Sequence, residues 1–300
     1  LAQNWPNRPI TLVVPFSSGG NTDIIARMVA DRLRDSFGQP VVVENRGGAA
    51  ANIGAAHAAK QPADGYTLLM ISNTHATNPS LYKNLTYNLE KDFVAVSPVA
   101  TVPNMLVVNN DLPARDMREF IALARSGNPE INYGSGGSGT SQHLAGALFN
   151  SMAKGKMVHV PYKQGSAALV DVMGNRVQAY FGGISEVASL IDGGKVRALG
   201  VTTQARSPRY PNIPAIAEFI PGYEIRIWIG LVAPRGTPQE AVTKINTAMK
   251  SILAEPETRR KLADLGAVPM NGTPDEFASF ISKEIVDLGK VVQISGAKVE

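Results

Sequence analysis

A strand followed by a glycine-rich loop and a helix occurs twice in this chain, and this repeat constrains the fold more than any other feature. The first copy runs from the apolar segment 10–16 through Ser17-Ser18-Gly19-Gly20 to apolar residues at helical spacing, which Gly38 ends. Asn21 or Thr22 is expected to cap that helix. The second copy joins a strand at 131–134 to a helix at 141–153. Because strands that alternate with helices pair in parallel, the sequence predicts an α/β fold.

The alternation continues in two series, and the length of 300 residues fits two domains. Further strands are predicted at 41–43, 67–71, 106–108, 157–160, 177–181, 196–201 and 225–232, and further helices at 52–60, 117–125, 167–173, 186–191, 238–253, 256–265 and 274–289. The last three helices have no strands of their own, so we expect them to return to the first series.

The predicted architecture is therefore two Rossmann-like α/β lobes joined by a hinge, with a ligand cleft between them. Lobe 1 is expected to be discontinuous, with residues 1–101 and 223–300, and lobe 2 to span residues 102–222. Two crossovers of this kind are typical of a binding protein that closes about a hinge.

Composition excludes several classes of function. The net charge is +4, but the densest basic cluster, Arg259-Arg260-Lys261, has Glu257 and Asp264 nearby and is interpreted as a solvated helix face, not a nucleic-acid site. The absence of Cys excludes thiolate chemistry and disulfides. No apolar run approaches the roughly 20 residues of a membrane helix. The start at residues 1–6 lacks an initiator Met, as in a processed exported protein or at an arbitrary boundary.

The two Ser/Gly loops are expected to bind an anion. In parallel α/β sheets, ligands lie at the carboxyl ends of strands, where helix N-termini expose unpaired N–H groups and a partial positive charge. Glycines allow close approach of the backbone, and serine and threonine hydroxyls add neutral donors. Hydrogen bonds to charged groups contribute about 1.5–3 kcal/mol each, so a few suffice for micromolar binding of a carboxylate. The alternative, that each loop is only a tight turn, stays open for each loop alone.

The short motifs in this sequence that resemble catalytic or cofactor-binding motifs do not indicate an enzyme. The second loop matches GxGxxG at 134–139, but Lys163 and Gln164 stand where a nicotinamide site would place an acidic residue, so dinucleotide binding is not expected. The SxxK matches at 80–83 and 151–154 lack their companion motifs and are treated as accidental. We therefore predict a protein that is not an enzyme and needs no cofactor.

The four histidines, His57, His75, His143 and His159, lack the spacing of a metal site. His159 lies in an apolar strand and is expected to be a packed histidine. For His75 and His143, ligand contact and structural capping are both open.

The sequence resembles the Bug family, the solute receptors of tripartite tricarboxylate transporters in proteobacteria such as Bordetella, nearly end to end. The residues that carry the resemblance are Trp5-Pro6, Pro9-Ile10, Pro15-Phe16, Gly19-Gly20, Asp23, Asp64 to Leu69, Tyr133 to Ser135, Gly139, His143-Leu144, Tyr162-Lys163, Asp171, Arg197 to Leu199, Thr202, Trp228, Gly230, Pro234 and Gly236 to Pro238. Departures at Arg46, Ala167, Gln178 and Ala215 concern the ligand and not the fold.

The resemblance implies a periplasmic binding protein of type II-like architecture, a monomeric receptor whose signal peptide has been removed. It would capture a dicarboxylate, tricarboxylate or aromatic carboxylate and deliver it to the membrane components of the transporter. An enzyme acting on a carboxylate in the same cleft, and a sensor or interaction module, are the alternatives. No obvious Asp or Glu is present to hold a ligand ammonium group, which disfavours amino acids. The residues expected to contact the ligand are Phe16, Ser17, Gly19, Gly20, Asn73, Thr74 and His75 in lobe 1, and Ser135, Gly139, Thr140, Ser141, Gly183 and Ser185 in lobe 2.

Overall fold

The computed structural model describes residues 5–299, so most of the N-terminal segment used to infer processing lies outside it. The chain divides into two compact units. The first unit comprises the residues up to Thr101, Trp228–Ala263 and Val268–Asp287, and the second comprises Val102–Ile227, Asp264–Ala267 and the residues from Leu288 onward. The lobes predicted from the sequence differ from these units at 223–227, 264–267 and 288–299, which group with the second unit.

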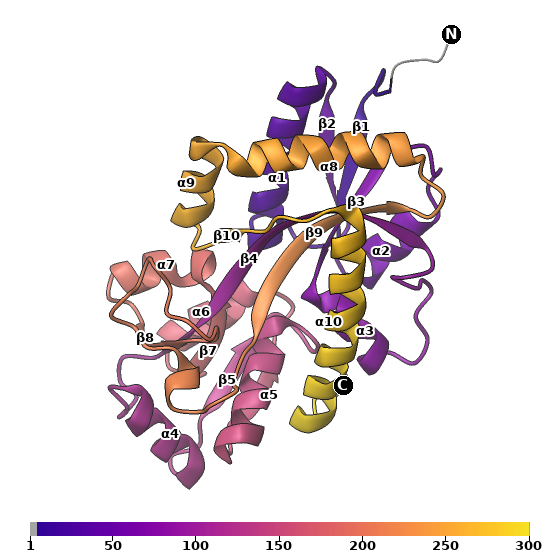
Figure 1. Cartoon of the computed structure of the whole chain (residues 1–300). Coiled ribbons are helices and arrows are strands. Elements are labelled where there is room, and N and C mark those ends of the chain that lie inside the picture. Colours follow the sequence, from indigo (N-terminus) through magenta and orange to yellow (C-terminus); the bar gives the residue numbers. More distant parts are fainter. Residues whose placement is uncertain (1–4, 300) are drawn as a thin grey trace. The chain divides into compact units, whose positions relative to one another are not determined.

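The first unit is built on a sheet with the strand order β2-β1-β3-β9-β4. β1 pairs in parallel with β2 and β3, whereas β9 is antiparallel to β3 and β10 is antiparallel to β4. The carboxyl ends of β1, β2 and β3 therefore share one edge. The elements, coloured along the chain in Figure 1, are β1 (Ile10–Val14), α1 (Asn21–Phe37), β2 (Val41–Asn45), α2 (Asn52–Ala59), β3 (Thr67–Ser72), α3 (Asn73–Leu81), the first part of β4 (Phe93–Val108), the end of β9 (Arg226–Pro234), α8 (Gln239–Ala254), most of α9 (Pro256–Asp264), β10 (Val268–Pro269) and most of α10 (Pro274–Ser295).

Burial explains why these segments form strands and helices. Leu12, Val13 and Val14 of β1 are fully buried, as expected of a strand covered on both faces. Helix α1 buries Val29 and Leu33 on one face, and it lies beside α8 (Figure 1). It ends where the sequence predicts, at Gly38, which adopts the left-handed conformation that glycine tolerates best.

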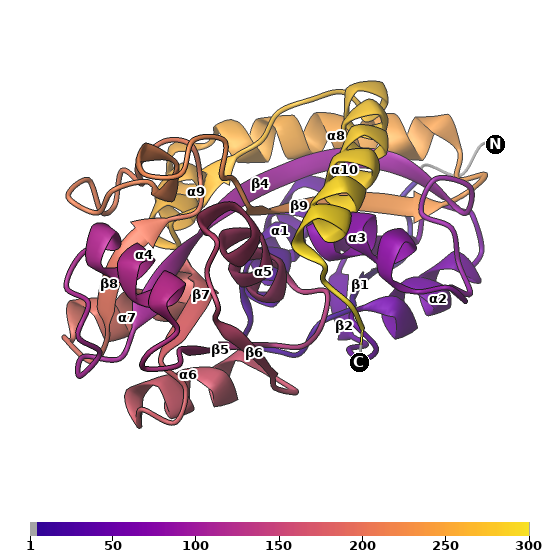
Figure 2. The same cartoon turned by 90° about the horizontal axis from the view of Figure 1, so that it is seen from below.

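The second unit has a sheet of its own, in which β7 and β8 both pair with the end of β4 in antiparallel orientation. β5 pairs in parallel with β6 and β7, so their carboxyl ends also share an edge. Helices α4 and α5 contact each other in this unit (Figure 2). The elements are α4 (Met117–Ser126), β5 (Asn132–Ser135), α5 (Ser141–Ala153), β6 (Val158–Pro161), α6 (Gly165–Met173), β7 (Ala179–Gly183), α7 (Ile184–Asp192), β8 (Arg197–Val201) and the short 3-10 helix η1 (Ile216–Glu218).

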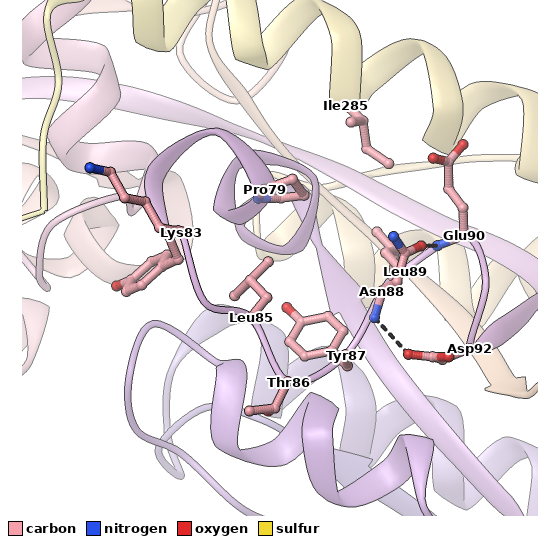
Figure 3. Close-up of a pocket in the computed structure, with 11 residues that line it drawn as sticks. Pro79, Lys83, Leu85, Thr86, Tyr87, Asn88, Leu89, Glu90, Asp92 and Ile285 are labelled. Carbon is pink, nitrogen blue, oxygen red and sulfur yellow. Dashed lines mark hydrogen bonds between the residues drawn. The ribbon is translucent and has the colours of Figure 1, made fainter.

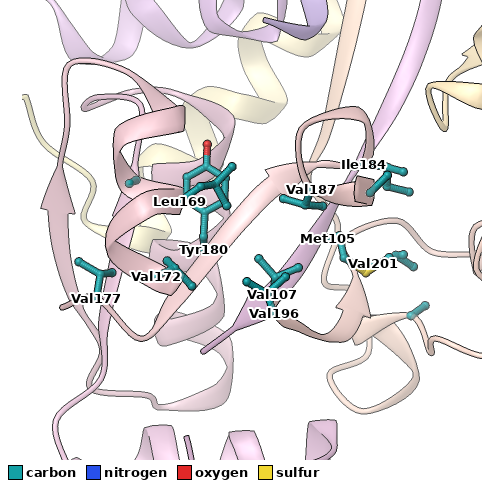
Figure 4. Close-up of a cluster of buried hydrophobic side chains, with 13 residues drawn as sticks. Met105, Val107, Leu169, Val172, Val177, Tyr180, Ile184, Val187, Val196 and Val201 are labelled. Carbon is teal, nitrogen blue, oxygen red and sulfur yellow. The ribbon is translucent and has the colours of Figure 1, made fainter. Parts of the chain in front are cut away.

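One hydrophobic cluster of the second unit joins its sheet to the helices α6 and α7. Met105 and Val107 of β4 pack with Leu169 of α6, Tyr180 of β7 and Val187 of α7 (Figure 4). This packing holds α6 and α7 against the sheet, and each helix begins after the carboxyl end of a strand, α6 after β6 and α7 after β7.

Helix α3 was not predicted from the sequence. Residues 73–81 contain Pro79 and few apolar residues, so they lack a helical hydrophobic period and suggest a loop. The structure shows a helix whose residues Asn73 to Asn78 are all buried, because tertiary packing encloses every face of it.

Candidate functional site

In the first unit, the first Ser/Gly loop joins β1 to α1 and is held by Asp23 in the first turn of the helix. The Gly19 N–H donates to Asp23 Oδ2 at 2.9 Å, and the Ser18 hydroxyl donates to the same oxygen at 3.3 Å. The Arg27 guanidinium forms an ion pair with it at 3.0 Å. Burial alone would raise the pKa of Asp23, but the hydrogen bonds from Arg27, Asn45 and Gly19 lower it. A buried carboxylate, whose charge Arg27 neutralises, therefore holds the loop in its conformation.

The capping of α1 differs from the prediction. The N-cap is Gly20, and neither Asn21 nor Thr22 caps the helix through its side chain. They lie one and two residues past the N-cap, in the first turn of the helix. Asn21 is 5% exposed, and neither its Nδ2 nor its Oδ1 has a hydrogen-bond partner among the described residues.

Helix α3 begins directly after β3 with a reciprocal capping box. Ser72 is the N-cap and accepts the Thr74 N–H, while the Ser72 N–H donates to His75 Nδ1 at 3.1 Å. Because Nδ1 accepts, the proton of the neutral imidazole lies on Nε2. His75 is fully buried, and its Nε2 and Asn73 Nδ2 have no hydrogen-bond partner within residues 5–299. Burial lowers the pKa of His75 to about 4.

The start of α3 and the first Ser/Gly loop lie together in the first unit. The ring of Phe16 meets the His75 ring edge-on, with 5.9 Å between centroids. Thr74 is buried at the same helix end, and Ser17 is exposed on the loop. The unit therefore gathers its predicted site residues at the shared edge of β1 and β3, together with Asn21.

The second Ser/Gly loop, in the second unit, is clamped at both ends by two stacked histidines. His159 Nε2 lies 2.6 Å from Ser135 Oγ at the start of the loop, and His143 Nδ1 accepts the Gly139 N–H at 3.0 Å near its end. The two imidazoles stack with centroids 3.9 Å apart. Burial lowers the pKa of His143 to about 4, and burial and the neighbouring His143 lower the pKa of His159 to about 3. His143 thus has the capping role, and its ligand contact stays a prediction.

Helix α5 begins after this loop with Thr140 as its N-cap. The Thr140 hydroxyl donates to the Gly137 carbonyl at 2.7 Å and accepts the His143 N–H at 3.4 Å. Ser141, next in sequence, accepts from Asn104 Nδ2 at 3.2 Å. The hydroxyl of Thr140 therefore stabilises the loop itself, and ligand contacts of Thr140 and Ser141 stay predictions.

Gly183 and Ser185 lie where β7 passes into α7. Gly183 is the N-cap of α7 and pairs with Asn104 of β4 in the strand register. The Asn104 amide joins this edge to α5 through its bonds to the Phe181 carbonyl, at 2.8 Å, and to Ser141. The predicted residues of the second lobe therefore come together at the shared edge of β5 and β7 in the second unit.

Four polar residues at these edges were not predicted as site residues: Asn21, Asn104, Gln142 and Glu186. Asn21, Gln142 and Glu186 each lie in the first turn of a helix that follows a strand. Their position could have identified them as site residues from the sequence, because side chains in the first turn of a helix lie at the same end of the helix as the preceding loop. Asn104 lies inside an apolar strand, and nothing local distinguishes it.

A pocket of about 490 Å³ lies elsewhere in the first unit (Figure 3). It is lined by Pro79 in the last turn of α3, by residues of the following segment from Tyr82 to Asp92, and by Ile285 of α10. None of the predicted site residues lines it. Its acidic groups already have partners, since Glu90 accepts from Ser282 at 2.6 Å and Asp92 accepts the Asn88 N–H at 2.6 Å.

Within residues 5–299, no group of three or more His, Cys, Asp or Glu side chains is placed to hold a metal ion. No helix in the described part of the chain is long and apolar enough to cross a membrane.

The fold and the two Ser/Gly loops together place this chain in a class of receptors. Residues 25–296 match the family described as the tripartite tricarboxylate transporter family receptor, and the chain belongs to this family. The resemblance to the Bug family is confirmed. The family is one of receptors, so the prediction of a protein that is not an enzyme is confirmed as well.

Relatives of known sequence and structure cover nearly the whole chain. Protein BugT of Bordetella pertussis is 36% identical over 302 residues, which is 100% of this chain and 93% of BugT. The structure of Rpa4515 from R. palustris with adipate is 38% identical and superposes with a TM-score of 0.94, covering 99% of this chain and all of that one. MatC from Rhodopseudomonas palustris with bound malate is 31% identical, with a TM-score of 0.88, and covers 96% of this chain and all of that one. These matches confirm the predicted α/β fold of a periplasmic solute-binding protein.

Proposed function

We propose that this protein is a periplasmic receptor that captures a small carboxylate for a tripartite tricarboxylate transporter. Its membership of the receptor family supports the transport role. Structures of its relatives with adipate and with malate support a carboxylate ligand. In this proposal the protein acts as a monomer and delivers its ligand to the membrane components of the transporter.

The observation that carries the proposal is a group of buried donors at the edge of β1 and β3. Asn21 Nδ2, Asn73 Nδ2 and His75 Nε2 are each buried without a hydrogen-bond partner among residues 5–299. A buried donor without a partner costs about 1–3 kcal/mol, so a ligand that satisfies several of them gains correspondingly. A carboxylate is acceptor-only and offers about four lone-pair sites, which matches this set of donors.

The charges near these donors also favour an anion. The donors lie at the N-terminal ends of α1 and α3, where the helix dipole attracts negative charge. The carboxylate of Asp23 is neutralised by Arg27, and the cap of α3 is a neutral imidazole. An incoming carboxylate therefore meets no unpaired negative charge from the groups that hold the loops.

In the proposed mechanism, the two units close about the hinge and enclose the ligand in a cleft. Phe16, Ser17, Gly19, Gly20, Asn73, Thr74 and His75 would line one side, and Ser135, Gly139, Thr140, Ser141, Gly183 and Ser185 the other. The N–H groups of Gly19 and Gly139 already donate to Asp23 and His143, so these glycines would shape the loops while neighbouring donors bind the ligand.

Thermal-shift screening over small carboxylates, followed by calorimetry, tests the proposal. A ligand at 100 times its Kd should stabilise the native protein by about 2.7 kcal/mol. Asn73→Asp replaces a buried donor with a carboxylate of the same shape, and we expect it to weaken carboxylate binding at least tenfold, or about 1.4 kcal/mol.

The matched control is Ser36→Ala, which changes an exposed hydroxyl far along α1 that donates to the Arg32 carbonyl. It should leave affinity unchanged. A complete absence of carboxylate binding by the wild-type protein, or equal affinities of wild type and Asn73→Asp, contradicts the proposal.

A further inference from the structure

In the second unit, the side chain of Gln142 is held so that its oxygen faces away from its partners. Gln142 lies in the first turn of α5 and is 8% exposed. Its amide hydrogen-bonds to the side chains of Tyr180 and Glu186. A carboxylate only accepts, so Nε2 must face Glu186. Gln142 Oε1 is then left over, buried and without a partner among the described residues.

This oxygen lies beside the second Ser/Gly loop. A Cβ atom placed on Gly136 would stand 3.6 Å from Gln142 Oε1 and 3.2 Å from the N atom of Gly165, the first residue of α6. Gly136, Gly165 and Gln142 therefore meet at the carboxyl ends of β5 and β6. The two glycines allow this close approach, since a Cβ atom on Gly165 would collide with the Tyr180 hydroxyl.

Asn104 of β4 leaves a second acceptor at the same edge. Its Nδ2 donates to the Phe181 carbonyl at 2.8 Å, which fixes the orientation of the amide because a carbonyl cannot donate. Asn104 is fully buried, and its Oδ1 has no partner within residues 5–299. Ser141, which Asn104 also contacts, is the neighbour of Gln142 in α5.

Glu186 adds an acidic group to these two acceptors. It accepts from the Tyr180 hydroxyl at 3.2 Å and from the Gly183 N–H in the first turn of α7. Burial raises its pKa, and the groups that act on it are Tyr180, Gly183 and Gln142, none of which is a cation. The unpartnered side-chain atoms of Gln142 and Asn104 at this edge are thus both acceptors, whereas those in the first unit include the donors Asn21 Nδ2, Asn73 Nδ2 and His75 Nε2.

We propose that Gln142 Oε1, Asn104 Oδ1 and Glu186 form an acceptor subsite that binds a hydrogen-bond donor of the ligand, a hydroxyl or an ammonium group. The inference rests on the proposed function and narrows it to carboxylates that carry such a donor. A ligand without one would leave the buried oxygens unpaired, and a second carboxylate placed there would be repelled. Sites built to bind a hydroxyl or amino group discriminate strongly against analogues that lack it, for the same reason.

Calorimetry at neutral pH with matched ligand series tests this subsite. The series are succinate, malate and aspartate; glutarate, 2-hydroxyglutarate and glutamate; and tricarballylate with citrate. Within the series that fits the protein, we expect the donor-bearing member to bind at least tenfold more tightly than its unsubstituted parent. The hydroxyl and ammonium members then show which donor is preferred.

Two variants assign the preference to the subsite. Gln142→Met keeps the length of the side chain but removes its acceptor. It should bring the ratio of the affinities for the donor-bearing ligand and its unsubstituted parent close to one, mainly by weakening the binding of the donor-bearing ligand. Glu186→Gln removes the negative charge and should reduce the affinity for an ammonium member more than for a hydroxyl member. Melting temperatures of both variants check that the fold is retained.

The outcomes separate the two proposals. If parents and substituted ligands bind the wild-type protein equally, or if both variants keep the wild-type ratio, the acceptor subsite is wrong while carboxylate capture stands. If no carboxylate of any series binds, the proposed function fails and the subsite fails with it.

Discussion

At the scale of single residues, three strand-to-helix connections are fixed by one acceptor in the third position of the following helix. Asp23, His75 and His143 accept the N–H groups of Gly19, Ser72 and Gly139. Glu and Gln are the usual residues for this role. Where the chain uses a carboxylate, at Asp23, Arg27 neutralises it. At the other two connections the acceptor is an imidazole that stays uncharged at neutral pH, because burial lowers its pKa to about 4.

This arrangement predicts that the charge at position 143 matters more to the ligand than to the fold. His143→Gln and His143→Glu both restore an acceptor for the Gly139 N–H, so we expect both variants to fold. The Glu variant adds a negative charge beside the loop, and a charge pair at a separation of roughly 8 Å interacts by about 2 kcal/mol at an effective dielectric constant near 20. Carboxylate affinity should therefore fall at least tenfold in the Glu variant relative to the Gln variant, as measured by calorimetry.

Salt distinguishes this charge effect from a structural one. The difference between the two variants should shrink as ionic strength rises. Equal affinities of the Gln and Glu variants in low salt would show that the neutrality of His143 has no part in binding.

At the scale of elements, the parallel strands β1 and β3 were predictable because they are buried on both faces and appear as continuous apolar runs. Residues 10–14 and 67–72 are of this kind. Helix α3 was not predictable, since its polar residues are buried by the surrounding elements and not by a periodic apolar face. Its misassignment as a loop still left Asn73, Thr74 and His75 among the predicted site residues, because any segment after β3 begins at that edge.

The packing of β9 against α10 leaves no room for a side chain at Gly230. A Cβ atom there would collide with the ring of Phe277, which itself packs edge-on against Trp228 with 6.1 Å between centroids. We expect Gly230→Ala to lower the free energy of unfolding by about 1–3 kcal/mol, the usual range for overpacking a core. Urea denaturation followed by circular dichroism measures this change.

Gly174→Ala is the matched control. An added Cβ at Gly174 would lie 3.5 Å from the nearest atom, which is an ordinary contact, and the backbone there has a φ of −83°. This variant should be close to neutral. Equal effects of the two substitutions would contradict the packing argument for Gly230.

At the scale of the whole molecule, the chain passes between its units within two long strands. The boundaries between units at 101/102 and 227/228 fall inside β4 and β9. Helix α10 also passes from the first unit to the second, between Asp287 and Leu288. These are the segments about which the proposed closure would bend.

Closure predicts a change of shape on ligand binding that small-angle X-ray scattering can detect. The radius of gyration of the wild-type protein should decrease when a bound carboxylate is added to saturation. At a carboxylate concentration equal to the wild-type Kd, the Asn73→Asp variant should show a much smaller decrease than the wild-type protein. An unaltered radius of gyration in a protein that calorimetry shows to be saturated would exclude capture by closure.

The sequence by itself determined the α/β alternation, the two Ser/Gly loops and the family, because these depend on local periodicity and on residues close together in the chain. Only the tertiary structure decided which polar groups remain without partners. Asn104 and Ser141 are distant in sequence, as are Ser135 and His159, and their contacts arise only when strands and helices pack. The different sets of unpartnered atoms, which include three donors beside β1 and β3 but only acceptors at Gln142 and Asn104, follow from that packing, since a polar atom is free for a ligand only when the fold has not already used it.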